Sequence, residues 1–258
     1  MHVELLELQR RVQGRVPLPS MDLTPAVIAA HQQNARPLLR FEDVPLEITD
    51  LRLMVRQTAD ILHRFGALDD ADHQQVIAAG RDERLLEMVG AWYRRGAGQH
   101  ALAAVGIGSS PPPDLPDLPA GLEQVLGQAM RPFLARAGEV LQQREDLAAW
   151  AHPHCPLCGG EPDFAVITPA AERHLLCGRC GLGWKFDALA CPYCPNSDRT
   201  RITSFATPDG QYRVYACDVC LRYLKAYDGR HAARPVMQVV DSVATLPLDA
   251  AAVQRGYS

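Results

Sequence analysis

The sequence lacks any apolar stretch near the roughly 18 residues that a membrane-spanning helix requires. It also lacks the common catalytic motifs: there is no His-Glu-x-x-His pair, no glycine-rich phosphate loop and no Ser/His/Asp constellation. No cysteine precedes Cys155 or follows Cys220. We therefore expect a protein that is neither inserted in a membrane nor an enzyme, with its distinctive chemistry confined to one part of the chain.

A strong positive charge is also missing. Residues 1–150 contain 15 arginines against 20 acidic residues, a net charge of −5, and residues 151–258 contain 9 arginines and 2 lysines against 10 acidic residues, a net charge of +1. Nucleic-acid-binding domains carry a clear basic excess, because phosphate contacts supply much of their affinity. The charge distribution argues against a nucleic-acid partner.

The eight cysteines form four Cys-x-x-Cys pairs with none left over. The pairs are Cys155/Cys158, Cys177/Cys180, Cys191/Cys194 and Cys217/Cys220. Each turn of this kind directs two sulfurs to one point, and two turns complete a tetrahedral four-sulfur site for zinc or iron. The sequence therefore predicts two metal ions, iron or zinc, each in a four-cysteine site that has no open coordination position.

The intervals between the pairs indicate how they combine. Eighteen residues separate the first pair from the second and 22 separate the third from the fourth, whereas only ten lie between the second and the third. The longer intervals suit a β-hairpin that closes on its own metal. Sequential pairing is favoured, and a cross-braced arrangement is the alternative.

Residues 1–150 have the periodicity of helices. In the clearest case, Leu51, Met54 and Val55 begin an apolar series with spacings of three and four residues. The expected helices span residues 3–13, 24–34, 49–65, 70–79, 82–96 and 121–150. Pro132 should kink or divide the last one, and the proline-rich stretch near 109–119 should interrupt the helical domain.

After residue 150 the pattern changes to short strands separated by turns. The expected strands span residues 164–168, 174–177, 184–190, 201–206, 211–216 and 223–227. We predict an α+β protein: a helical N-terminal domain at 1–150, two tandem rubredoxin-like (zinc-ribbon) modules at 151–190 and 191–230, and a tail at 231–258 that packs back as one or two helices.

Other uses of the cysteines and histidines are less consistent with the sequence. Cys191-Pro192-Tyr193-Cys194 could be a dithiol redox centre, but such a centre opens a helix, and here Pro195 starts a turn. Structural disulfides would require export, whereas the N-terminus has no signal-peptide pattern, so we expect a cytoplasmic protein. His152 and His154, beside the first pair, are expected to be surface groups or to support the ligands.

Several of these motifs occur in the same order in one known family. They are Cys155-Pro156-Leu157-Cys158-Gly159, Cys177-x-x-Cys180-Gly181 with Trp184, Cys191-Pro192-x-Cys194, Cys217-x-x-Cys220-x-x-Tyr223-Leu224-Lys225, and Ala244-Thr245-Leu246-Pro247-Leu248-Asp249 with Gly256-Tyr257. On these residues the chain resembles the FdhE family, the formate dehydrogenase accessory proteins. The resemblance covers 150–257 well and is weaker over 1–150.

The resemblance implies a cytoplasmic accessory factor for the assembly of respiratory formate dehydrogenases. Such a factor binds the catalytic subunit of the enzyme, holds two rubredoxin-like metal sites and has no catalytic residues of its own. The alternative is a zinc-ribbon adaptor that binds nucleic acid or the transcription apparatus. Such an adaptor would use the arginines that stand near tyrosines, which are Arg199, Arg201, Arg213, Arg222 and Arg230.

The two predicted metal sites differ in one respect. In the first site, glycine follows the second cysteine of both turns (Gly159 and Gly181), whereas the second site has Pro195 and Leu221 at these places. Glycine permits the positive φ that aims backbone N–H groups at sulfur. We therefore expect the second site to bind metal more weakly than the first.

Overall fold

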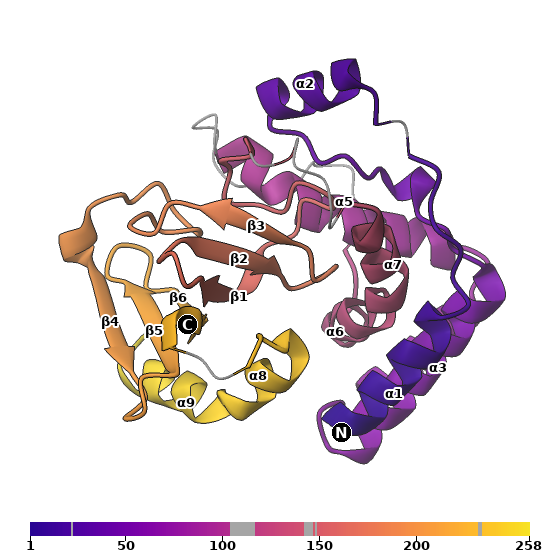
Figure 1. The fold of residues 1–258 in the computed structure, drawn as a ribbon. Helices are drawn as coiled ribbons and strands as arrows, with labels where there is room; N and C mark the ends of the chain where they lie inside the picture. The colour runs from indigo at the N-terminus through magenta and orange to yellow at the C-terminus, as the bar shows by residue number, and fades with distance from the viewer. Residues whose placement is uncertain (22, 104–116, 142–146, 148, 232–233) are drawn as a thin grey trace.

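The computed structural model describes the chain except for residues 22, 104–116, 142–146, 148 and 232–233. Most of the proline-rich interruption predicted near 109–119 thus lies outside the described residues. A group of N-terminal helices lies beside a six-stranded sheet, and two short C-terminal helices lie along the far part of that sheet (Figure 1). The predicted α+β class is confirmed.

The N-terminal half is helical, as its periodicity indicates. Its elements are α1 (His2–Gln13), α2 (Pro25–Asn34), the 3-10 turn η1 (Phe41–Asp43), α3 (Ile48–Arg64), α4 (Asp70–Arg81), α5 (Leu85–Ala103), α6 (Ala120–Ala129) and α7 (Arg131–Leu141). The apolar face of α3, which includes Leu51, Met54 and Val55, is fully buried. Pro132 divides the last predicted helix in two, since α7 begins one residue before it.

One predicted helix end is wrong. We expected a helix to stop at Arg94-Arg95-Gly96, but α5 continues to Ala103. Gly96 lies against Arg179, and a Cβ at this position would overlap the guanidinium. Similarly, Gly80 lies inside α4, where an added Cβ would lie 3.3 Å from a methyl group of Val55. Both glycines allow close packing between elements and do not end a helix.

All six strands form one sheet in the order β3-β2-β1-β6-β5-β4. Their bounds are β1 (Pro162–Ile167), β2 (Arg173–Cys177), β3 (Gly183–Phe186), β4 (Ile202–Ala206), β5 (Tyr212–Cys217) and β6 (Tyr223–Asp228). Each predicted ribbon is a three-stranded antiparallel unit. The two units join through β1 and β6, which pair in parallel with Ala165 opposite Ala226.

The main hydrophobic core is shared between the helices, the first ribbon and strand β6 of the second ribbon. It contains buried residues of α3 and α6 together with Leu157, Cys158 and Trp184. The second ribbon has a smaller cluster of its own around Val214 and Ala216. Because the main core crosses residue 150, the helical part and the first ribbon bury each other's surface; the division into 1–150, 151–190, 191–230 and 231–258 stays a prediction.

Two helices near the C-terminus pack on the second ribbon. They are α8 (Gln238–Ala244) and α9 (Leu246–Gln254), and 3-10 turns occur at η3 (Arg199–Arg201) and η4 (Gly229–His231). Lys225 bonds the carboxylate of Asp249 at 2.7 Å, and the Tyr212 hydroxyl donates to the buried carboxylate of Asp241 at 2.8 Å. Within the described parts of the chain, no helix has the length and apolar character needed to cross a membrane.

Candidate metal centres

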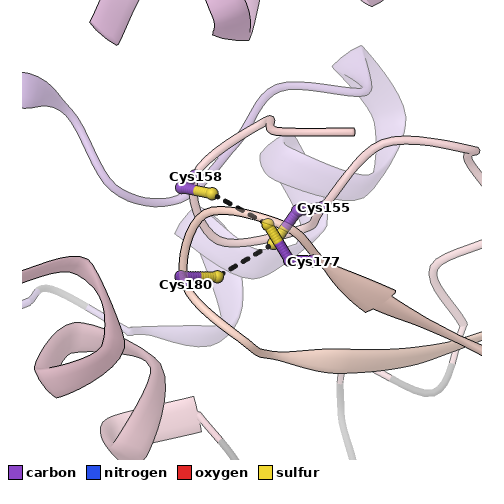
Figure 2. Close-up of side chains that lie close together, drawn as sticks. All are labelled: Cys155, Cys158, Cys177 and Cys180. Carbon is purple, nitrogen blue, oxygen red and sulfur yellow. Dashed lines mark hydrogen bonds between the residues drawn. The ribbon is translucent and has the colours of Figure 1, made fainter. Parts of the chain in front are cut away.

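The first centre is built from the turn before β1 and the turn after β2. The Sγ atoms of Cys155 and Cys180 lie 3.5 Å apart, as do those of Cys158 and Cys177 (Figure 2). All four sulfurs lie within 4.8 Å of one another, and all four residues are buried. The structure thus brings together the first and second pairs.

The second centre combines the third and fourth pairs in the same way. The Sγ atoms of Cys191 and Cys220 lie 3.7 Å apart, as do those of Cys194 and Cys217. Cys194 and Cys220 are partly exposed, unlike any ligand of the first centre. The third pair lies in a turn that faces the fourth, and the next element is η3, so its setting differs from the helix-opening dithiol of a redox centre.

Both sulfur sets fit a tetrahedral metal ion. A zinc–sulfur bond of about 2.3 Å in a tetrahedron corresponds to sulfur–sulfur separations of about 3.8 Å, and the separations here are 3.5 and 3.7 Å. Zinc or iron, once bound, would cross-link the two turns of each centre. The roles of the eight cysteines as ligands and the choice between iron and zinc stay predictions.

The backbone around the sulfurs repeats in three of the four turns. The residue after the second cysteine donates its N–H to the carbonyl of the first, at 3.0 Å for Gly159, 3.0 Å for Gly181 and 2.9 Å for Leu221. These residues have φ values of 70°, 74° and 58°. Pro195, in the equivalent place of the third turn, has no N–H to donate. The second centre therefore contains one strained turn and one turn without this hydrogen bond.

Replacing Leu221 by glycine should stabilise the zinc-loaded protein by about 1 kcal/mol, because a left-handed backbone is unfavourable for a residue with a Cβ. Leu221 is 53% exposed, so the substitution removes little buried surface. Val219, which is 54% exposed and has no positive φ, is the matched control. Val219→Gly should lower the midpoint of thermal unfolding, whereas Leu221→Gly should raise it; a fall in both would contradict the strain at Leu221.

Arg179 attaches the first centre to the helical half. It lies between the two cysteines of the second turn, and its guanidinium donates to the carbonyls of Tyr93 and Trp92 at 3.1 Å each. The same guanidinium stacks on the Trp92 ring, 4.0 Å from its centroid. Closing this turn on a metal therefore also fixes a contact to α5.

The first turn of this centre is attached to a different part of the helical half. Leu38 and Leu39 donate their backbone N–H groups to the carbonyls of Pro156 and Leu157, at 2.9 and 2.8 Å. The Tyr93 hydroxyl donates to the Leu39 carbonyl at 2.7 Å, which connects this segment to α5. Both turns of the first centre are thus bonded to the N-terminal half.

His154 is buried beside the first centre. Of the two roles expected for it, a group that supports the centre therefore fits better than a surface group. Only 1% of His154 is exposed. The ring Nε2 of His154 lies 3.0 Å from the Ala35 carbonyl, and the Trp150 indole N–H donates to the backbone carbonyl of His154 at 2.8 Å. His152 is half-buried and lies edge-on to Trp150. Neither histidine belongs to the sulfur clusters.

Each centre contains thiols of raised pKa and one thiol of lowered pKa. Burial raises the pKa of Cys155 and Cys180, whereas hydrogen bonds from the neighbouring thiols lower the pKa of Cys158. At the second centre, burial opposes ionisation of Cys217, but hydrogen bonds from the backbone N–H groups of Cys220 and Val219 lower its pKa to about 7. Burial also raises the pKa of Cys191, so metal must displace protons at both centres, which makes loading pH-dependent.

Graded chelation should remove zinc in two phases, the second centre first. Two of its four cysteines are partly exposed and both of its turns are less favourable. Supporting contacts of this kind alter metal affinity by about 10–100-fold. The coloured chelator 4-(2-pyridylazo)resorcinol would follow release. Alkylation after the first phase, mapped by mass spectrometry, should label Cys194 and Cys220 and spare Cys155. A single phase that labels both centres equally would refute the difference.

A cavity of about 680 Å³ lies between the two halves, beside the first centre. Its lining includes Trp92 and Gly127 from the helices and Asp163, Arg179, Arg222 and Lys225 from the ribbons. Arg222 spans the two ribbons: it donates to Glu161 at 2.9 Å and stacks on Tyr193, 3.8 Å from the ring centroid. The cavity is therefore formed jointly by helices and sheet.

The fold and the two sulfur clusters define a class: a helical half fused to a sheet that holds two four-cysteine centres. No protein-family model and no curated protein matches the chain. Among solved structures, the crystal structure of the FdhE protein from Pseudomonas aeruginosa is similar over 100% of this chain and 84% of that one, with a TM-score of 0.59 and 22% sequence identity. The chain therefore has the fold of FdhE.

The sequence indicated the cysteines but not the contacts that position them. Nothing in the sequence relates Arg179 to Trp92, 87 residues away. The one available signal was the position of Arg179 between the two cysteines of a Cys-x-x-Cys turn. There the backbone is fixed and the side chain has to point away from the metal site. The cavity between helices and sheet had no sequence signal at all.

Proposed function

We propose that this protein is an FdhE-type accessory factor that assists the assembly of a respiratory formate dehydrogenase by binding its catalytic subunit. The observation that carries the proposal is that the FdhE fold extends over the whole chain. The two four-cysteine clusters lie where the family resemblance requires metal. The protein acts as a binding factor and catalyses no reaction itself.

The metal ions are proposed to be structural. A four-sulfur site occupies every position of a tetrahedral ion, so no position is open to a substrate. The first centre is buried in the main core and bonded to both α5 and the segment at Leu38. Free thiols arranged as metal sites are typical of a reducing compartment, which supports a cytoplasmic location.

The cavity between helices and sheet is the proposed place for a segment of the client subunit. Its walls are of mixed chemistry, since Trp92 and the charged residues Arg222, Lys225 and Asp163 all line it. Such a combination suits an extended peptide, whose backbone and side chains need both polar and apolar contacts. Arg179, which lies between two cysteines of the first centre, also lines this cavity. Metal bound at the first centre would therefore preserve the shape of the cavity.

The proposal is tested by recovering partners from the host cell with tagged protein and identifying them by mass spectrometry. The intact protein should recover a formate dehydrogenase catalytic subunit. A variant with Cys155→Ser and Cys158→Ser should not, because without the first centre much of the fold is lost, the cavity between helices and sheet included. Recovery by both proteins would support the proposed client but show that its binding does not depend on the first metal centre. Recovery of nucleic acid or transcription proteins instead would replace the proposal with the ribbon-adaptor alternative.

A further inference from the structure

A second cavity, of about 400 Å³, lies on the helical half between α3 and α4, away from both metal centres. The apolar part of its wall includes Val55 and Val76, both fully buried. Gly80 lets α4 approach α3 closely at this place. The volume is at the lower end of the range for small-molecule sites, which is about 300–1,000 Å³.

Three arginines line the same cavity: Arg52, Arg56 and Arg81. Among the described residues, the side chains of Arg56 and Arg81 make no hydrogen bond or ion pair, and the side chain of Arg52 makes one long hydrogen bond, 3.4 Å, to the Asp82 carbonyl. Guanidinium groups that surround an apolar hollow without acidic partners form a site for an anion.

Two acidic residues that adjoin the cavity-lining residues in the sequence, Asp50 and Asp82, are engaged elsewhere. Asp82 accepts from the backbone N–H and the side chain of Arg84, at 2.8 and 3.2 Å. Asp50 pairs with Arg15 at 2.9 Å. The helical half is acidic overall, with a net charge of −5 over residues 1–150. Its acidic residues nevertheless do not neutralise the positive charge at this cavity. A ligand that brings its own negative charge would supply the missing partner.

We propose that this cavity binds a ligand with a carboxylate or phosphate on an apolar body. The anion lies at the rim, where Arg56 and Arg81 donate paired hydrogen bonds to its oxygens. The apolar body lies against Val55 and Val76, which removes its surface from water. The site is separate from the proposed assembly function, so either can fail while the other stands.

Methyl NMR on the full-length, zinc-loaded protein tests the site with octanoate and its neutral analogue octanol. Octanoate should shift the methyl signals of Val55, Val76 and Ile77 and should bind at least about tenfold more tightly than octanol, since hydrogen bonds to charged groups are the stronger ones. The double variant Arg56→Gln/Arg81→Gln should lose that preference and bind octanol as before. The control Arg36→Gln/Arg199→Gln removes equal charge from two exposed arginines elsewhere and should behave as wild type.

The source of the carboxylate is distinguished by a third probe, acetylated dileucine with a free C-terminal carboxylate. Tighter binding of this peptide than of octanoate at the same methyl groups would indicate a protein C-terminus, and weaker binding would indicate a free small-molecule acid. The inference is overturned if octanoate shifts no methyl group of the cavity. It is also overturned if octanoate and octanol bind equally, or if the control variant loses as much affinity as Arg56→Gln/Arg81→Gln.

Discussion

Replacing Cys155 and Cys158 by serine should unfold much of the protein, the helical half included. Structural zinc contributes about 10–16 kcal/mol of apparent binding free energy in small zinc-dependent folds, whereas a whole domain is stable by about 5–15 kcal/mol. Both cysteines are fully buried in the core that the helices share with the first ribbon. Loss of this centre therefore removes support from both halves. Circular dichroism at 222 nm should show reduced helix and no cooperative thermal transition.

The matched control is the pair Cys194→Ser/Cys220→Ser at the second centre. These cysteines are partly exposed, and although strand β6 contributes to the main core, the second ribbon also has a small core of its own. This variant should lose one equivalent of metal, keep its helix content and retain a cooperative transition at a lower temperature. Equal loss of helix in the two variants would mean that the second centre supports the helical half as strongly as the first.

Local patterns were enough to predict most elements. The apolar series from Leu51 gives α3, the position of Pro132 gives the division between α6 and α7, and period-two patterns give the strands of both ribbons. The spacing of the cysteines gives the grouping of their sulfurs. These features depend on residues near one another in sequence or on the stereochemistry of a single turn. Both can be inferred from the residues of one short segment.

Contacts between distant segments were not predictable in the same way. Alternation defines a strand but not its neighbour, so the parallel pairing of Ala165 with Ala226 could not be anticipated. Gly96 was misinterpreted as a helix end because its actual reason, the guanidinium of Arg179, lies in another part of the chain. Burial of His154 has the same origin, since its ring bonds the carbonyl of Ala35.

Replacing Gly127 by tryptophan should abolish recovery of the formate dehydrogenase catalytic subunit while leaving the protein folded. Gly127 lines the cavity between helices and sheet, and a Cβ added there meets no atom within 4 Å. The large side chain can therefore occupy the cavity without displacing the protein around it. Helix α6 should tolerate the change, because glycine inside a helix is less favourable than alanine by about 1 kcal/mol.

Gly127→Ala is the control, since a single methyl group leaves the cavity open and should favour the helix slightly. Both variants should bind two equivalents of zinc and unfold cooperatively, and only the tryptophan variant should lose the client, by more than about tenfold, which is the effect of 1.4 kcal/mol. Undiminished recovery with Gly127→Trp would place the client on another surface. Loss with both variants would point instead to a change in α6, because alanine cannot fill a cavity of about 680 Å³.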